Sequence, residues 1–408
     1  MSNAAELEAL TQDYGREIFG RLVRNGPILF TPRWWDDRVM GWSMRDEAVK
    51  VQLFRFVDVL PMLRSPPTIV GHLREYFAEA GNGVPGWLRL GLRLLPSRGL
   101  LGRLTARTTY RSAERLARRF ISGSNIDEAL HAIAALRRRK LAFTVDLLGE
   151  ATITESEAEA SQREYLSLLT ELSEEVNAWP EVSLIDRDDR GPLPRVNVSV
   201  KLSALYSQFD AIDPEGTSRA VRARLRPLLR AARRNRAFVN FDMEQFSTKD
   251  ITLQIFREVL EEDEFRDWPD VGIAIQAYLR DTEDDLKRLA AWVEKRGTSV
   301  WVRLVKGAYW DYETIFAHEQ GWPVPVFEHK PETDANYERC TELLMRNHHL
   351  LRPALGSHNV RSLAHGLALA QHLNLPPGRC EIQMLYGMAE PIKDALVSLK
   401  QRVRVYTP

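Results

Sequence analysis

The sequence predicts an α/β protein, a (β/α)8 barrel preceded by an all-helical N-terminal arm, and three observations favour this fold. From Leu141 to Pro408, short apolar or β-branched runs alternate with amphipathic stretches, which is the order that builds a parallel sheet. Eight such runs occur, the number of strands in a closed barrel. Polar and ionisable residues follow these runs at their carboxyl ends, where barrel enzymes place their active sites.

The chain before Leu141 has the spacing of helices. Residues 5–24 and 127–140 carry apolar side chains three and four positions apart, and Ser122–Asp127 supplies capping residues for the second segment. We therefore divide the chain into a helical N-terminal arm, residues 1–123, and a barrel domain, residues 124–408.

The strand candidates share an apolar or β-branched centre, and in chain order they span residues 141–150, 195–202, 237–244, 271–279, 299–308, 351–359, 380–385 and 402–407. The amphipathic helices expected between them cover residues 223–234, 251–262, 284–295, 337–347 and 362–373. A doubly wound open sheet is the alternative, although no strand candidate runs into a GxGxxG turn.

Composition excludes several classes of function. The 56 basic residues balance 56 acidic ones, which gives no argument for a nucleic-acid partner. Two cysteines, Cys340 and Cys380, are too few for a disulfide framework and favour a reducing cytoplasm. Residues 1–19 carry acids where a secretory signal needs basic residues, and no window approaches the ~20 apolar residues of a membrane-spanning helix. The absence of HExxH, GxSxG and P-loop motifs counts against metal, serine-hydrolase and nucleoside-triphosphate chemistry.

The polar residues at the strand ends form the main functional signal. Charged groups there cost free energy unless they are paired or used, so a ring of them predicts a polar mouth on one rim. Ion pairs that only seal the barrel are the alternative for any single member. The ring consists of Asp146, Glu150, Lys201, Asp242, Glu244, Gln276, Tyr278, Arg303, Lys306, His358, Asn359, Gln383 and Tyr406.

The stretch VRLVKGAYWDYE, residues 302–313, brings cations, a glycine and large aromatic rings to one strand end. These residue types suit a flat, anionic cofactor such as a flavin nucleotide, with Arg303 near the ring. Lys201 and Lys306 interrupt apolar strands and can each neutralise a carboxylate or phosphate, act as a Schiff-base nucleophile, or reach solvent. Trp310 as a core residue and His358 as an inert, satisfied histidine are the alternatives at those positions.

Several motifs resemble those of a known family. DLLGEA, VSVKLSAL, NFDME, IQAYLRD, VRLVKGAYWD, SHN, QMLYGMAEP and RVYTP occur in the order found in the proline dehydrogenase domain of proline utilisation A, a family of bifunctional flavoenzymes. The resemblance extends from about Phe120 to the C-terminus. It implies a distorted (β/α)8 barrel that holds non-covalent FAD, oxidises L-proline to Δ1-pyrroline-5-carboxylate and passes electrons to a quinone, the first step of proline catabolism to glutamate.

The resemblance also implies residue roles. Arg303 would lie beside the flavin N5 and Gln276 would contact the ring, with the other cofactor contacts made by Val305, Lys306, Gly307, Ala308, Trp310, Thr333, His358, Asn359 and Gln383. Lys201 would bind the proline carboxylate, and the wall of the substrate site would consist of Asp242, Tyr309, Leu385 and Tyr406. Glu150 matches a carboxylate that gates the site by pairing with an arginine of the last barrel helix.

One departure from the family pattern is the end of the sequence at Pro408, after the eighth strand. The family continues into an eighth helix, whose two arginines clamp the substrate carboxylate, and then into an aldehyde dehydrogenase domain. We therefore expect a barrel that lacks its last helix, in a fragment or truncated product with weak activity, and a pyrroline-5-carboxylate dehydrogenase domain or chain as partner.

Two further interpretations remain open. A Schiff-base lyase or aldolase on the same barrel, or a non-catalytic binding or vestigial fragment, would also use this set of residues.

Residues 87–119 hold nine arginines against the single acid Glu114. This basic segment predicts peripheral contact with the inner face of the membrane, and a solvated helix face is the alternative.

Overall fold

A computed structural model describes residues 3–24, 71–72, 75, 121–147 and 152–408. Most of the predicted arm, the basic segment 87–119 and Glu150 lie outside these residues. Among the described residues, 3–24 group with 122–147 and 152–408 into one compact unit.

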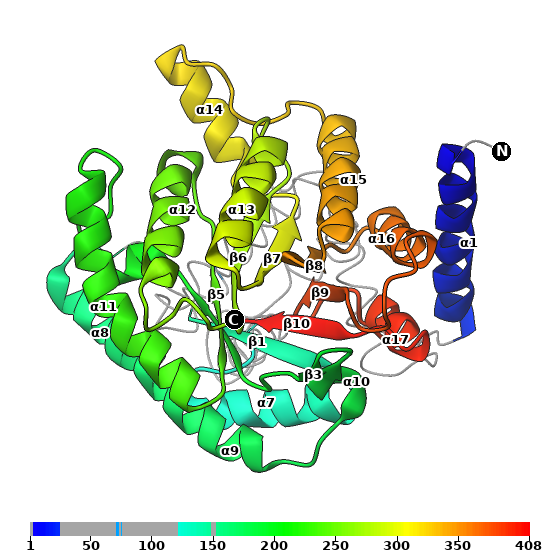
Figure 1. Cartoon of the computed structure of the whole chain (residues 1–408), viewed down its shortest axis with the longest axis horizontal. Helices are drawn as coiled ribbons and strands as arrows, with labels where there is room; N and C mark the ends of the chain where they lie inside the picture. The colour runs from blue at the N-terminus through cyan, green and yellow to red at the C-terminus, as the bar shows by residue number, and fades with distance from the viewer. Residues whose placement is uncertain (1–2, 25–70, 73–74, 76–120, 148–151) are drawn as a thin grey trace. The chain divides into compact units, whose positions relative to one another are not determined.

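The centre of the described structure is a closed barrel of eight parallel strands (Figure 1). In chain order they are β1 (Ala142–Asp146), β4 (Asn197–Val200), β5 (Phe238–Phe241), β6 (Val271–Gln276), β7 (Val300–Val305), β8 (Leu351–Gly356), β9 (Glu381–Leu385) and β10 (Val403–Thr407). Each strand pairs with the next along the chain, and β10 closes the ring on β1 with Ala142 opposite Arg404. All eight predicted strands are confirmed, and the open doubly wound sheet is wrong.

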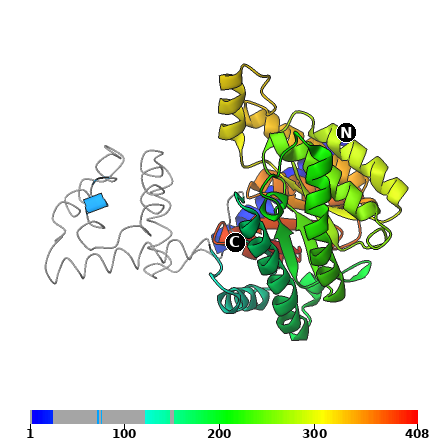
Figure 2. The ribbon, with the colours of Figure 1, turned by 90° about the vertical axis from the view of Figure 1, so that its left-hand side faces the viewer.

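The strands form because their β-branched and apolar residues are buried on both faces, as parallel sheets require. The helices that precede the first strand and lie between the later ones in the chain pack outside the ring (Figure 2). They are α7 (Ile126–Arg138), α8 (Glu155–Ser167), a π-helical turn (Leu168–Leu172), α9 (Ser173–Ala178), α10 (Ser183–Asp186), a 3-10 turn (Leu202–Leu205), α11 (Pro214–Arg234), α12 (Phe246–Glu261), α13 (Thr282–Arg296), α14 (Trp310–Gln320), α15 (Lys330–Arg346), α16 (Val360–His372) and α17 (Glu390–Ser398). The five helices predicted between strands lie within α11, α12, α13, α15 and α16.

Helix α1 (Asn3–Arg24) packs on the barrel, against α16 and α17. Tyr14 donates to Gln371 at 2.7 Å, and Glu8 forms an ion pair with Arg361 at 2.9 Å. The first helix of the predicted arm is therefore attached to the barrel unit. The boundary at residue 123 stays a prediction, since the residues that would define the rest of the arm are not among those described.

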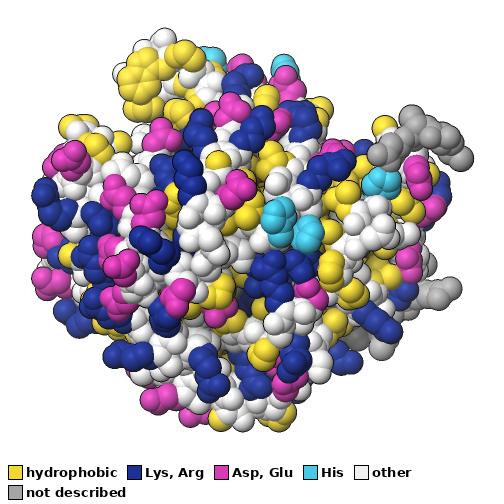
Figure 3. All heavy atoms as spheres, in the orientation of Figure 1, with side chains coloured by type: hydrophobic (Ala, Val, Ile, Leu, Met, Phe, Trp, Pro, Cys, Tyr) yellow, Lys and Arg dark blue, Asp and Glu magenta, His cyan; other side chains and the backbone are white. Residues whose placement is uncertain are grey.

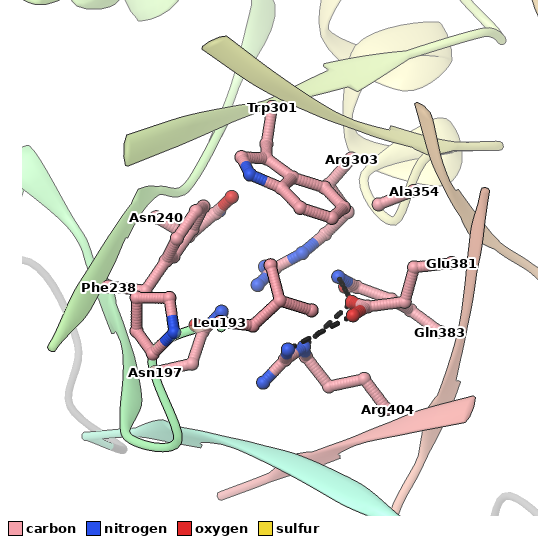
Figure 4. Close-up of a pocket in the computed structure, with 11 residues that line it drawn as sticks. Leu193, Asn197, Phe238, Asn240, Trp301, Arg303, Ala354, Glu381, Gln383 and Arg404 are labelled. Atoms are coloured by element: carbon pink, nitrogen blue, oxygen red, sulfur yellow. Dashed lines mark hydrogen bonds and ion pairs between the residues drawn. The ribbon is translucent and has the colours of Figure 1, made fainter. Parts of the chain in front are cut away.

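The amino end of the barrel is closed by a hairpin that the sequence did not predict, β2 (Arg187–Asp188) with β3 (Gly191–Pro192). Asp188 pairs with Arg352 of β8, and the following Leu193 enters the barrel base (Figure 4). Leu193 packs there with Phe238 and Trp301. The cavity inside the barrel at this end measures about 10 Å³, which is too small for anything larger than a water molecule.

Helix α14 projects beyond the ring of helices, and apolar side chains gather over it (Figures 1 and 3). Tyr312, Ile315 and Trp322 are between 44% and 59% exposed, and the Tyr312 ring stacks on Phe316. The rest of the face in Figure 3 shows intermixed cations and acids, in keeping with the zero net charge.

Candidate active site

A cavity of about 550 Å³ opens at the carboxyl ends of the strands. Its wall includes most of the predicted site residues, which come from all eight barrel strands and the loops that follow them. It is lined by Asp146, Lys201, Asp242, Met243, Glu244, Ala274, Gln276, Arg303, Val305, Lys306, Gly307, Ala308, Tyr309, Lys330, Gly356, Ser357, His358, Asn359, Gln383, Met384, Leu385 and Tyr406. Three predicted residues among those described, Tyr278, Trp310 and Thr333, do not line it, and the Tyr278 ring is buried against Leu279 and Val326 instead.

The floor of the cavity is a network centred on Asp242, directly after β5. Its Oδ1 accepts from Arg303 Nη1 at 2.7 Å and from Ser199 Oγ at 2.6 Å, and its Oδ2 accepts from the Tyr406 hydroxyl at 2.8 Å. Three strands thus fix one carboxylate. The Arg303 guanidinium also lies over the Tyr406 ring, 4.9 Å from its centroid, which orients both side chains toward the cavity.

Lys201 lies beside this network at the end of β4. Its ammonium donates to Asp146 of β1 and lies 3.8 Å from Asp242 Oδ2. Burial, and then the negative charge of Asp242, raises the pKa of Asp146. Burial likewise raises the pKa of Glu244, which accepts from Ser203 Oγ at 2.8 Å. The floor therefore brings two cations and three carboxylates together.

The loop after β7 forms a second part of the wall. Gly307 has φ +132°, and a Cβ added there would lie 2.4 Å from the Tyr278 ring, so only glycine fits. Lys306 pairs with Asp334 of α15, which Lys330 also contacts at 2.6 Å. Thr333 is buried beside them in the first turn of α15.

Trp310 begins α14 and is 40% exposed, so its interpretation as a core residue is wrong. Its indole N–H donates to the Phe327 carbonyl at 2.8 Å. The structure places it on the outer surface, next to the cavity loop rather than on the cavity wall.

His358 and Leu385 connect the ends of β8 and β9. The Leu385 N–H donates to His358 Nε2 at 3.1 Å, so the ring proton of neutral His358 is on Nδ1. Burial, and then Lys393 of α17, lowers the pKa of His358. Lys393 in turn donates to the Leu385 carbonyl at 2.8 Å. The main chain of Leu385 is therefore held on both sides, and its side chain faces the cavity.

Several atoms on this wall are buried without a hydrogen-bond partner among the described residues: Gln276 Oε1, Arg303 Nε, Arg303 Nη2, His358 Nδ1 and Gln383 Oε1. Unpartnered buried polar atoms are costly unless a ligand or water satisfies them. The set contains both donors and acceptors, beside a glycine that permits close approach. These residues fit a flat, polar-edged group such as a flavin ring.

The residue that sequence reasoning undervalued is Asp146. It was included in the polar ring but received no role, although it is the direct partner of Lys201. Lys393 was missed: its pair with Glu390, three positions earlier, has a local signal, but its bond to the Leu385 carbonyl has none. Within the described ranges no group of three or more His, Cys, Asp or Glu residues could hold a metal ion.

Comparison with known proteins identifies the family. The family model described as "Proline dehydrogenase" matches residues 129–408, and the model described as "Proline utilization A N-terminal domain" matches residues 8–120. The chain belongs to the proline dehydrogenase family. Proline dehydrogenase 1 of Bacillus subtilis is 26% identical over 293 residues, which are 72% of this chain and 81% of that protein.

Larger relatives share the same region. The bifunctional protein PutA of Klebsiella aerogenes is 29% identical over 300 residues, 72% of this chain and 22% of that protein. The crystal structure of proline utilization A from Bdellovibrio bacteriovorus inactivated by N-propargylglycine superposes with a TM-score of 0.87 at 43% identity. That alignment covers 99% of this chain and 39% of the other. The aligned region thus spans about a fifth of the length of the Klebsiella relative and 39% of the length of the Bdellovibrio one.

Proposed function

We propose that this chain oxidises L-proline to Δ1-pyrroline-5-carboxylate with FAD as its cofactor, as the first step of proline catabolism. The observation that carries the proposal is the cavity at the carboxyl end of a barrel of the proline dehydrogenase family. It combines a paired lysine, a fixed arginine and unpartnered polar atoms within about 550 Å³, enough for a small substrate beside a ring system.

Residues of this chain would hold the cofactor. The five buried, unpartnered atoms of Gln276, Arg303, His358 and Gln383 would bond to the polar edge of the ring. Gly307 would allow close approach, while Lys306 and Asn359 would contact its more distant parts. Val305, Ala308, Thr333 and Trp310 complete the proposed set. Bound FAD supplies the acceptor for the hydride that leaves the ring carbon beside nitrogen.

The substrate would lie over the cluster of Lys201, Asp242 and Tyr406. Lys201 would bind the carboxylate, because its side chain lines the cavity and is 19% exposed, against 6% for Arg303. Tyr309, Leu385 and Tyr406 form an apolar wall that positions the pyrrolidine ring and excludes water. Asp242 holds Tyr406 and Arg303 in place. Glu150, outside the described residues, keeps its proposed gating role.

The observed geometry disfavours the Schiff-base alternative. Lys201 donates to Asp146, and Lys306 is paired with Asp334. An ion-paired ammonium has no free lone pair with which to attack a carbonyl. No observation on this barrel favours the lyase over the oxidation.

We further propose a quinone as the electron acceptor and a pyrroline-5-carboxylate dehydrogenase domain or chain as the partner that uses the product. A cytoplasmic enzyme in contact with the inner face of the membrane would suit this acceptor. None of the helices in the described ranges is long and apolar enough to cross a membrane. The basic segment 87–119, which would make the membrane contact, is not described.

The test is anaerobic titration of the purified, FAD-loaded chain with L-proline. We expect the oxidised flavin absorbance to bleach and a product two mass units lighter than proline to form. D-proline is the matched control, because the same groups reach the wrong face of the ring. A flavin spectrum that neither isomer changes would contradict the proposed function.

A further inference from the structure

Asp146, the partner of Lys201, lines the cavity beside the proposed substrate position and has no role among those assigned so far. Asp146 ends β1, is 5% exposed, and bonds to Lys201 through Oδ1. Lys201 Nζ lies within hydrogen-bond reach of Asp146 and 3.8 Å from Asp242. A single ammonium therefore lies between two carboxylates.

The two carboxylates differ in how well they are satisfied. Asp242 accepts bonds from Arg303, Ser199 and Tyr406, so its negative charge is fully used. Asp146 has Lys201 as its paired cation and the Tyr406 hydroxyl as a further hydrogen-bond partner. If Lys201 moves its bond to another anion, Asp146 loses its main stabilising cation while Asp242 keeps its own.

We infer that Asp146 accepts the proton that the substrate ammonium must lose before oxidation, and that release of Lys201 to the substrate carboxylate prepares it to do so. This inference rests on the proposed function. The step is R₂NH₂⁺ + Asp146–COO⁻ → R₂NH + Asp146–COOH, in which one N–H bond breaks, one O–H bond forms, and no electrons are exchanged. The neutral amine then has the lone pair that the departure of hydride from the adjacent carbon requires.

The surroundings of Asp146 favour uptake of a proton by its carboxylate. Burial and the charge of Asp242 raise the pKa of Asp146, whereas Lys201 opposes the rise. The other charged or titratable groups that face it from packed elements, among the described residues, are Tyr406 of β10, Tyr165 of α8 and Tyr309 after β7. Burial raises the pKa of each of these phenols, so none supplies a competing charge near neutral pH. Glu244, the remaining carboxylate, bonds to Ser203 instead.

The decisive variant is Asp146→Asn in the FAD-loaded chain, with flavin reduction by proline measured across pH. We expect the rate to fall by about 10²–10⁴ near neutral pH, the range for loss of a proton acceptor. The ratio of the parent rate to the variant rate should fall by about tenfold per pH unit as the pH rises toward the pKa of the free secondary amine. More of the substrate then arrives without the proton. A variant that is merely misfolded would stay slow at every pH.

A matched control is Asp285→Asn, which also breaks a buried aspartate–lysine pair, with Lys249 at 2.8 Å, away from the cavity. It should lower the melting temperature and leave the pH profile of reduction unchanged. A second readout is binding of tetrahydrofuran-2-carboxylate, which has the carboxylate and ring but no amine proton. Asp146→Asn should bind it at least as tightly as the parent chain, since Lys201 is freed.

The outcomes separate the two proposals. If the parent chain shows no reduction by proline, the proposed function fails, and the role of Asp146 fails with it. If the parent chain is active and Asp146→Asn follows the same pH profile within twofold, only the role of Asp146 is overturned. Weaker binding of the ring-oxygen analogue by Asp146→Asn would also overturn it, because that result indicates a structural role.

Discussion

The two ends of the barrel use similar residues for opposite purposes. At the amino end, Glu381 accepts from Arg404 at 2.7 Å and pairs with Arg402 at 3.0 Å, and the space left is about 10 Å³ (Figure 4). Arg303 lies between this space and the cavity of about 550 Å³ at the carboxyl end, and two of its donors have no partner among the described residues. The comparison teaches that buried charge alone does not identify an active site. Hydrogen-bond donors and acceptors that lack a partner and border a cavity are the better indicator of an active site.

The largest effect should come from the closed end. Glu381→Ala leaves two buried guanidiniums without their carboxylate, and we expect a loss of about 3–5 kcal/mol in the free energy of unfolding, measured in urea. Glu264→Ala removes an exposed pair with Arg230 and should cost only about 0–1 kcal/mol. Equal losses in the two variants would refute the distinction between buried and exposed pairs.

The next effect concerns the open end. Arg303→Ala and Lys306→Ala should each weaken FAD binding by about 1.5–3 kcal/mol, the contribution of a charge-assisted contact, as measured by flavin fluorescence titration. Arg361→Ala, which breaks an ion pair with Glu8 on the outer surface, is the control and should leave FAD affinity unchanged. Unchanged affinity in both cavity variants would reject the flavin assignment.

A third prediction compares the buried carboxylate of Glu381 with the half-buried carboxylate of Asp270 by pH. Burial alone would raise the pKa of Glu381, but Arg404 and Arg402 lower it to about 2, so its contribution is present above the unfolded value and is lost as the pH falls from about 4.5 to 2. Burial raises the pKa of Asp270 to about 6, so ionised Asp270 destabilises the fold as the pH rises from about 4 to 6. Asp270→Asn should therefore add about 1–3 kcal/mol to the free energy of unfolding at pH 8 and nothing below pH 4. A pH-independent effect would contradict this.

The smallest effect concerns two asparagine helix caps, one expected to affect stability alone and the other expected to affect both stability and FAD binding. Asn125 caps α7 by accepting from Glu128 N at 3.0 Å, and Asn359 caps α16 by accepting from Ser362 N at 3.2 Å. Substitution of either residue by alanine should cost about 1 kcal/mol of stability. Only Asn359→Ala, which lies on the cavity wall, should also weaken FAD binding. A binding loss in Asn125→Ala would remove this distinction.

The sequence predicted those elements that a local pattern of residues encodes. The barrel strands were found because each is an apolar run bounded by turn residues, and Asn125 was recognisable as a cap. Helix α8 was missed because its composition is largely polar and only Ala158 and Tyr165 are buried along it. The β2–β3 hairpin was missed because its two-residue strands are held by tertiary ion pairs such as Asp188–Arg352, which have no local signal.

The same division applies to the site. Strand-end positions placed Lys201, Asp242, Arg303 and Tyr406 on one rim, and they do lie together there. The strand-end positions did not show which carboxylate contacts which cation. Those ion pairs depend on how the barrel closes. The bond of Lys201 to Asp146, rather than to Asp242, is such a case.

The seam between β1 and β10 has a consequence for biosynthesis. Seven of the eight strand pairs join neighbours along the chain, whereas Ala142 pairs with Arg404, 404 − 142 = 262 positions later. At a synthesis rate of about 5–20 residues per second, β1 leaves the ribosome roughly 13–50 s before its partner. Throughout that interval its unpaired edge is open to pairing with other chains. Nascent chains should therefore be most vulnerable to aggregation, and most dependent on chaperones, until the last strand emerges.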